Sequence, residues 1–182
     1  MFAHDDILMR PVERKDLGFL REIRNQPSTW ENLTSIDHIS PEAQEAWFAG
    51  LADAKDRAYF TVCLNDLDHD FPILVEGNVI GLIRMDEIDT LNRSMRVGAD
   101  VGPGYRGQGY GTKIYKMLLK YCFDYLGMHR VWLCVLDTNE VGIKLYVNSG
   151  FKLEGKYREA IWRDGGWHDY IVMSLLEGDY RA

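Results

Sequence analysis

The stretch 97-VGADVGPGYRGQGYGT-112 decides the fold of this chain. It begins as a strand-like run, breaks into glycines after Val101, and turns helical from Gln108 or Gly109, because apolar residues recur every three or four positions beyond that point. The first N–H groups of such a helix have no intrahelical partner, and together with the positive end of the helix dipole they attract an anion. The stretch therefore predicts a phosphate-binding loop between a strand and a helix.

The residue types of this loop suit a bulky anion. Its glycines lack the β-carbons that would keep a phosphate away from the backbone, and Arg106 adds a fixed positive charge at the mouth. The expected phosphate contacts are Arg106, Gly107, Gln108, Gly109, Tyr110, Gly111 and Thr112. Lys113 and Lys144 either add local positive charge or belong to solvated helix faces.

Two common phosphate motifs fit this stretch poorly. A Walker A loop needs Gly-Lys-Ser/Thr, whereas residues 111–113 are Gly-Thr-Lys. Residues 102–107 match the G-x-G-x-x-G spacing of a dinucleotide site, but the preceding strand carries Arg96 and Asp100, and the next acid that could follow a strand, Asp137, lies too far along the chain. A Rossmann-type protein is thus a remote alternative.

A third phosphate-binding pattern fits better. The run 106-RGQGYG-111 resembles the (Arg/Gln)-x-x-Gly-x-(Gly/Ala) signature with which the GNAT superfamily of acyltransferases holds the pyrophosphate of acetyl-coenzyme A. The segment from Asn139 through Tyr146 to Gly150-Phe151 resembles that family's "N…LY…GF" block, at the spacing the family uses.

Segments outside the loop point to one branch of that family. The pair Arg24-Asn25, the run 39-ISPEAQ-44 with Trp47-Phe48, and the ending 164-DGGWHD-169 are similar to the RimJ/RimL-like branch. The resemblance extends from about Leu8 to Leu176. It implies an N-acetyltransferase that uses acetyl-coenzyme A as co-substrate.

The resemblance also implies roles for individual residues. The strand end at Ala99 to Val101 would splay from its neighbour and offer its backbone to the pantetheine and the acetyl carbonyl. Tyr146 would act as general acid toward the leaving thiolate, for which a phenol is a suitable proton donor; its alternative role is core packing. Asn139 would contact the cofactor, cap its own helix, or do both.

The sequence does not identify a general base. Met95 aligns with the glutamate that some relatives carry before the loop, and Arg96 stands where RimJ/RimL-like members often have an acid. The remaining candidates, each also suited to a surface or turn position, are Glu31, His38, Glu76, Asp86, Glu87 and Asp100. A chain of water molecules is the other possibility.

The acceptor pocket is expected near the N-terminal helices. Arg24, Asn25 and the segment 39–48 occupy the part of the fold that usually builds it in this family. Aromatic walls are expected from Trp30, Trp47, Trp162 and Trp167. These residues are compatible with a peptide N-terminus, a polyamine or an amino sugar such as PseH-like relatives acetylate, and the pattern leans toward an amino sugar or a peptide.

Composition agrees with a globular enzyme. The chain has 182 residues, of which 46% are hydrophobic and 27% charged, as expected of a single domain covering residues 1–182. It shows no secretory leader and no apolar run approaching membrane-spanning length, so we expect a cytoplasmic protein with no membrane partner. The formal net charge of −7 disfavours nucleic acid and mildly favours a cationic acceptor.

The cysteines suggest no special chemistry. Cys63, Cys122 and Cys134 are odd in number and lack Cys-x-x-Cys spacing, which argues against a disulfide framework and a zinc site, and no metal is expected. No residue near them in sequence would activate a thiolate, so we expect none of them to carry the acetyl group. The acidic run 66–70 is expected to be a solvated loop.

The order of predicted elements defines the fold class. Strands are expected at 7–10, 59–64, 71–76, 79–87, 95–101, 130–136, 151–162 and 167–175, the third and fourth as a hairpin. Helices are expected at 16–24, from Pro41 after an N-cap at Ser40, from 108 or 109 to about Leu126, and at 139–148. This predicts an α/β fold with one mixed, mostly antiparallel sheet, a splayed strand pair and helices on both faces.

These expectations combine into one functional hypothesis. The chain would transfer acetyl from acetyl-coenzyme A to a primary amine by direct attack in a ternary complex, as a monomer or homodimer acting on a small-molecule or peptide amine. The alternative from another class is a binding or sensor module that holds acyl-coenzyme A without turnover.

Overall fold

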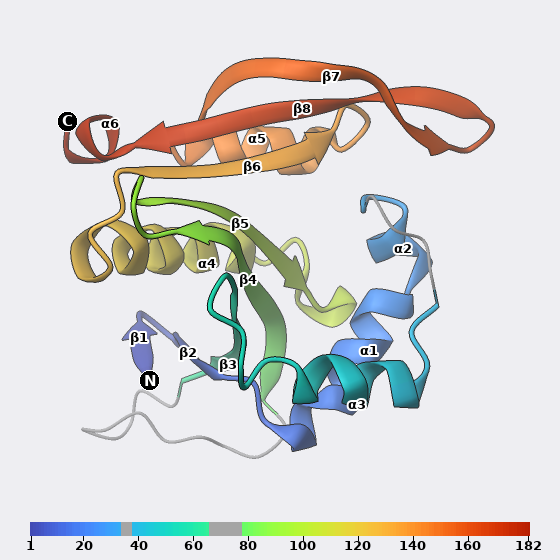
Figure 1. The fold of residues 1–182 in the computed structure, drawn as a ribbon. Coiled ribbons are helices and arrows are strands. Elements are labelled where there is room, and N and C mark those ends of the chain that lie inside the picture. Colours follow the sequence, from blue (N-terminus) through green and yellow to red (C-terminus); the bar gives the residue numbers. More distant parts are fainter. Residues whose placement is uncertain (34–37, 66–77) are drawn as a thin grey trace.

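The computed structural model describes residues 1–33, 38–65 and 78–182, and within them the chain forms one eight-stranded sheet in the order β1-β2-β3-β4-β5-β6-β8-β7 (Figure 1). The strands are β1 (Phe2–His4), β2 (Ile7–Pro11), β3 (Ala58–Leu64), β4 (Val79–Asp89), β5 (Ser94–Val101), β6 (Arg130–Leu136), β7 (Lys152–Arg163) and β8 (Gly166–Leu176). The α-helices are α1 (Leu17–Asn25), α2 (Pro27–Trp30), α3 (Pro41–Ala49), α4 (Tyr110–Lys120), α5 (Glu140–Asn148) and α6 (Glu177–Arg181).

The pairing of β5 with β6 differs from every other pairing in the sheet. All other neighbours run antiparallel, whereas β5 and β6 are parallel. Their ladder covers only Ser94–Arg96 opposite Arg130–Trp132, and both strands continue beyond it without pairing to each other. The sheet therefore opens between β5 and β6, and the predicted mixed, mostly antiparallel sheet with a splayed strand pair is confirmed.

Helices cover both faces of the sheet, as predicted. On one face α4 buries Ile114, Met117 and Leu118 against β-strand residues, and α5 packs against the same core. On the other face α1 and α3 lie over β3 and β4, in a smaller core that contains Leu20, Leu82 and Trp47 (Figure 1). The splay thus lies between two helical layers, which places it within reach of both.

Local sequence signals explain several helix ends. The Ser40 hydroxyl accepts a hydrogen bond from the Ala43 N–H at 3.1 Å and caps α3, as predicted. The Asn139 side chain caps α5 by accepting from the Gly142 N–H at 2.9 Å. Gly127 and Gly150 have φ of 63° and 92°, a left-handed conformation that glycine adopts without strain.

Some element predictions need correction. The helix expected to run to Leu126 changes at Tyr121, where Tyr121–Tyr125 form a π-helical turn. Strand β1 and helix α6 were not predicted; β1 is only three residues long and α6 only five, too short for a periodic signal. The strand predicted at 71–76 and the acidic run 66–70 lie outside the described residues. Within the described chain, no helix has the length and apolarity needed to span a membrane.

Candidate active site

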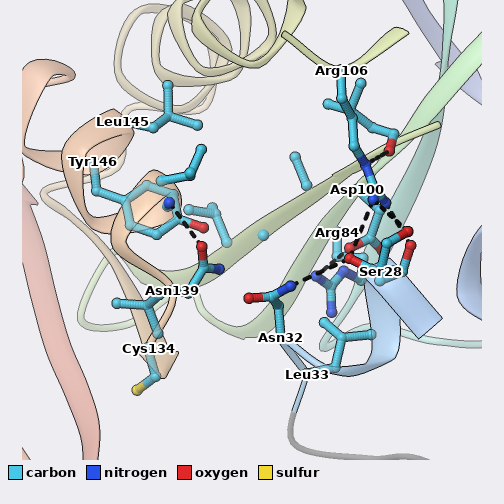
Figure 2. A pocket seen from close by; sticks show the side chains of 18 of the residues that line it. Ser28, Asn32, Leu33, Arg84, Asp100, Arg106, Cys134, Asn139, Leu145 and Tyr146 are labelled. Carbon is cyan, nitrogen blue, oxygen red and sulfur yellow. Dashed lines mark hydrogen bonds and ion pairs between the residues drawn. The ribbon is translucent and has the colours of Figure 1, made fainter. Parts of the chain in front are cut away.

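The splay between β5 and β6 opens a cleft of about 830 Å³. One wall is the free edge of β5, from Val97 to Val101, and the other comes from β6, α5 and Tyr170 of β8. Figure 2 shows Asn139 and Tyr146 on one side of the cleft, opposite Arg84, Asp100 and Arg106. From Val97 to Val101, β5 pairs with β4 on one side and has no partner strand on the side of β6. This edge can therefore offer N–H and C=O groups to an extended ligand, as a sheet edge offers them to an added strand.

The predicted phosphate loop joins this edge to α4. Gly107 and Gly109 have φ of 73° and 84°, and Gly109 is the N-cap of α4. A β-carbon on either would meet no atom within 4 Å, so conformation and access, not packing, account for these glycines. Gly111 differs, because a β-carbon there would lie 3.3 Å from Leu145 of α5. The loop thus leaves the first N–H groups of α4 open to an anion.

Arg106 holds this loop to helix α2. Its Nε donates to the Val101 carbonyl at 2.9 Å, its Nη1 to Ser28 Oγ at 2.8 Å, and its Nη2 to Thr29 Oγ1 at 2.6 Å. These partners are uncharged, so none of them offsets the positive charge of the guanidinium, which lines the cleft. The other predicted cations are engaged elsewhere: Lys113 pairs with Asp6 at 2.7 Å, and Lys144 lies 3.9 Å from Glu140.

Tyr146 lies on the α5 wall of the cleft. Its ring is half-buried and packs against Tyr115 and Phe151, with centroids 5.1 and 6.0 Å apart. Burial raises the pKa of Tyr146 above its usual value, so the hydroxyl stays protonated at neutral pH. Tyr146 therefore packs through its ring and also lines the cleft, and its role as general acid stays a prediction.

A second pocket, of about 470 Å³, adjoins the cleft. Its floor is one face of β3, β4 and β5, where Leu82 pairs with Asp100, Arg84 with Gly98, and Asp86 with Arg96. Its walls come from α1, α3 and the segment before α3: Leu20, Arg24, Ile39, Ala43, Gln44 and Trp47. Trp47 meets Tyr59 edge-on, with ring centroids 5.3 Å apart.

The two cavities share four lining residues: Arg24, Arg84, Asp86 and Arg96. We call these the junction. The Asp86 carboxylate accepts the Tyr59 hydroxyl and lies 3.7 Å from the Arg96 guanidinium. Burial and this hydrogen bond raise the pKa of Tyr59 to about 12, so Tyr59 remains a donor to Asp86. A molecule in the second pocket would meet one in the cleft at this point.

The candidate general bases lie in different parts of the structure. Asp86 is in the junction, whereas Asp100 is buried between Arg24 and Arg84, and Glu87 pairs with Arg96 at 3.2 Å. Glu31 and His38 are exposed and line neither cavity, and Glu76 lies outside the described residues. Met95, at the position of the family glutamate, is fully buried in the core.

Only some of the residues predicted to line the acceptor pocket line a cavity. Arg24 and Trp47 line the second pocket. Asn25 instead ties α1 to the segment before α3, donating to the Ile39 carbonyl at 3.0 Å and accepting its N–H at 2.8 Å. Trp30 lines neither cavity. The expectation that Trp162 and Trp167 form aromatic walls is wrong: they pack on each other in the exposed β7–β8 hairpin.

Of the predicted cofactor contacts, six line the cleft: Ala99, Val101, Arg106, Gly107, Asn139 and Tyr146. Gln108, Gly109, Tyr110, Gly111 and Thr112 lie at its end, where α4 begins, and Gln108 donates to the Gly104 carbonyl at 2.8 Å. Sequence reasoning missed Arg84 and Tyr170. The alternation of Leu82, Arg84 and Asp86 along a predicted strand could have placed Arg84 on the face that carries Asp86.

Comparison with known proteins shows the family to which the chain belongs. Residues 6–152 match the family described as "Acetyltransferase (GNAT) domain". The chain belongs to the GNAT acetyltransferase family. Spermidine N(1)-acetyltransferase of Escherichia coli is 27% identical over 180 residues, which cover 99% of this chain and 90% of that protein. The L-amino acid N-acetyltransferase AaaT of Escherichia coli is 25% identical, over 94% of this chain and 99% of AaaT.

A solved structure shows the same fold. The spermidine N-acetyltransferase of Vibrio cholerae, determined with CoA and spermine, superimposes with a TM-score of 0.88 over 98% of this chain and 100% of that one, at 23% identity. As a GNAT N-acetyltransferase, the protein uses acetyl-coenzyme A as its acyl donor. The open glycine loop and the free β5 edge fit that molecule. Among the described residues no cluster of His, Cys, Asp or Glu is arranged to hold a metal ion.

Proposed function

We propose that the protein transfers the acetyl group of acetyl-coenzyme A to the primary amine of a small acceptor by direct attack in a ternary complex. The observation that carries this proposal is the junction, where two cavities meet at Arg24, Arg84, Asp86 and Arg96. The cleft would hold the thioester and the second pocket the amine. The reactants would then meet without a covalent enzyme intermediate, and the gain would come from orientation.

The cofactor side of the reaction would rest on backbone groups and one hydroxyl. The first N–H groups of α4 would hold the pyrophosphate, and the β5 edge at Ala99–Val101 would hold the pantetheine and donate an N–H to the acetyl carbonyl. Asn139, beside the cleft, would contact the pantetheine while its side chain caps α5. Tyr146 would give its hydroxyl proton to the sulfur as the C–S bond breaks.

The acceptor side needs a neutral amine and a group that takes a proton from it. Asp86 is the carboxylate that lines both cavities, and the Tyr59 hydrogen bond orients it. We assign it the proton that the amine loses as the C–N bond forms. Proton balance then closes, because the sulfur gains one proton from Tyr146 and the amine gives one up to Asp86.

An acyl-cysteine route has weaker support. Cys134 lines the cleft, but burial raises the pKa of its thiol, which leaves less of the thiolate that would attack a thioester. Cys63 and Cys122 are buried, and burial raises the pKa of each, to about 12 for Cys122. Direct attack by the amine is therefore the simpler chemistry for this site.

The proposal is tested by incubating the purified protein with acetyl-coenzyme A and a panel of primary amines while free thiol is measured. We expect thiol release that depends on the amine, intersecting initial-rate lines, and no acetylated cysteine by mass spectrometry after incubation with cofactor alone. Parallel lines or acetyl-Cys134 would contradict direct attack. Tight cofactor binding without thiol release from any amine would instead favour a binding module.

A further inference from the structure

The junction contains three arginines and one carboxylate, that of Asp86. Arg24 from α1 and Arg84 from β4 both form an ion pair with Asp100. The Nη1 of Arg24 lies 3.5 Å from one Asp100 oxygen and the Nη2 of Arg84 lies 3.3 Å from the other. Both contacts exceed the roughly 2.7–2.9 Å of a close charge-assisted hydrogen bond. One carboxylate thus serves two guanidinium groups, and a positive charge remains.

The other arginines of the second pocket are neutralised locally. Arg96 pairs with Glu87 at 3.2 Å and lies 3.7 Å from Asp86, and Arg57 donates to Asp56 at 2.9 Å through two nitrogens. Among the described residues, the Arg24–Asp100–Arg84 group thus has one carboxylate for two guanidinium groups, whereas the neighbouring Arg96 faces two carboxylates, Glu87 and Asp86. Both arginine side chains are 24% exposed and line both cavities, so they remain open to a ligand.

This group is held in a fixed geometry. Arg84 lies flat on β5 at Gly98, where a β-carbon would come within 2.9 Å of its Nη2. Burial alone would lower the pKa of Arg84, but facing acidic groups, Asp100 first, raise it above its usual value. Its Nε is buried without a hydrogen-bond partner in the described structure. A planar, positioned guanidinium with free N–H groups matches a carboxylate or phosphate.

On the basis of the proposed function, we infer that the acceptor is a small primary amine that also carries an anionic group, a carboxylate or a phosphate, bound by Arg24 and Arg84. The anionic group would lie at the Arg24 and Arg84 side of the junction, a few bonds from the amine that faces Asp86. The rest of the acceptor would lie on the apolar wall of the second pocket: Leu20, Ile39, Trp47 and Leu82.

The same charges work against a polyamine. A polyamine carries several ammonium groups and no anion, and like charges brought together at a binding site cost several kcal/mol. The arginines would also lower the pKa of a nearby ammonium group, which helps to supply the neutral amine for attack. The proposed acceptor thus differs from the cationic acceptor that the net charge of −7 mildly favours.

Matched pairs of amines test this inference. Phenylalanine and phenethylamine differ by a carboxylate, and glucosamine 6-phosphate and glucosamine differ by a phosphate; spermidine represents the polycations. We expect at least tenfold higher kcat/KM for the anionic member of one pair, and the pair with the larger ratio identifies carboxylate or phosphate. Equal or better use of the neutral members or of spermidine would overturn the inference and leave the proposed transferase function standing.

Variants of the arginine pair separate acceptor recognition from cofactor binding. Arg24→Gln should lower the anionic-to-neutral ratio at least tenfold, mainly through KM, while acetyl-coenzyme A affinity changes less than twofold; Arg24→Lys should restore part of the ratio. Arg158→Gln, an exposed arginine on β7, is the matched control that keeps the ratio. Weaker cofactor binding by Arg24→Gln with an unchanged ratio would overturn the inference.

A binding measurement tests anion recognition even if the protein turns over none of the amines. N-acetylphenylalanine and N-acetylphenethylamine are matched products, and calorimetry measures their affinities directly. We expect the anionic product to bind at least tenfold more tightly, and Arg24→Gln to remove that difference. Absence of thiol release with every amine would reject the transferase function alone, whereas equal affinities for the two products would reject anion recognition.

Discussion

The cleft, which we assign to the cofactor, and the second pocket, which we assign to the acceptor, both contact strand β5, yet they are built in different ways. The cleft is formed largely by backbone: the free edge of Val97–Val101, the glycine loop and the start of α4. The acceptor pocket is formed by side chains from α1, α3, β3, β4 and β5, including four arginines. Backbone geometry serves a ligand that is the same for a whole family, whereas side chains can change with each acceptor.

The largest expected effect comes from removing the hydroxyl of Tyr146, which lines the cleft. Tyr146→Phe keeps the ring contacts with Tyr115 and Phe151 but removes the proton donor. We expect kcat to fall by about 10²–10⁴, with acetyl-coenzyme A affinity and folding nearly unchanged, measured by thiol release, calorimetry and thermal unfolding. The loss should shrink with an acyl donor whose thiol leaves more readily.

Tyr157→Phe is the control for this change, because Tyr157 is an exposed tyrosine on β7. It should leave kcat unchanged. If Tyr146→Phe retains nearly full turnover, the general acid is a water molecule or another hydroxyl.

The next effect concerns the buried side-chain network that joins β2 and β3 to the start of α1. Arg10 and Asp16 form a buried bidentate pair at 2.6 and 2.7 Å, and Thr61 donates to Asp16 at 3.0 Å. Asp16→Asn leaves the buried Arg10 with the exposed Glu13, 3.6 Å away, as its remaining carboxylate partner. It should lower the free energy of unfolding by about 3 kcal/mol, the low end of the cost of breaking a buried pair. Asp53→Asn, at an exposed position, should change it little.

The same pair predicts a dependence on pH. Burial would raise the pKa of Asp16, but hydrogen bonds from Arg10, the Glu13 N–H and Thr61 outweigh it and lower the pKa below its usual value. Its contribution to stability is therefore complete above about pH 4, the usual aspartate pKa, and is lost as the pH falls through the lower native pKa. Urea unfolding at pH 7 and pH 3 should show this loss in the wild type and a smaller one in Asp16→Asn.

The contrast between backbone and side chains also explains what could be predicted from the sequence. The glycine loop, the helix that follows it and the Asn139–Phe151 block are local in sequence, so the cofactor cleft and the fold could be predicted from them. The predicted caps at Ser40 and Asn139 are confirmed for the same reason. A short stretch of chain carries all the information such features need.

The acceptor pocket depends on contacts between distant residues. Arg24 meets Asp100 across 76 positions. The alternation along a strand gives the face on which Arg84 lies, but not the residue that it meets. Trp162 and Trp167 were expected in the pocket because of residue type alone, and the hairpin places them in solvent. Register across β4 and β5 decides which charges meet, and it was not predicted.

The smallest expected effect tests whether the loop acts through its backbone. Gly109 has φ of 84°, and valine there would be strained by about 1–2 kcal/mol while its branched side chain obstructs the approach of a phosphate. We expect Gly109→Val to weaken acetyl-coenzyme A by about ten- to a hundredfold, or about 1.4–2.7 kcal/mol, in calorimetry. Gly104→Val is the control, because Gly104 is in the same loop, has open space around it and lacks a positive φ.

Gly109→Asn separates strain from access. Asparagine tolerates the left-handed conformation better than other non-glycine residues, yet it still adds a β-carbon where the phosphate would approach the first turn of α4. If access decides binding, this variant should unfold like the wild type and still bind acetyl-coenzyme A at least tenfold more weakly. If it binds normally while Gly109→Val does not, the glycine is required for the loop conformation alone. Equal affinity of Gly109→Val and Gly104→Val would remove the phosphate loop from the site, and the cleft would then have to hold its cofactor by side chains, as the acceptor pocket holds its ligand.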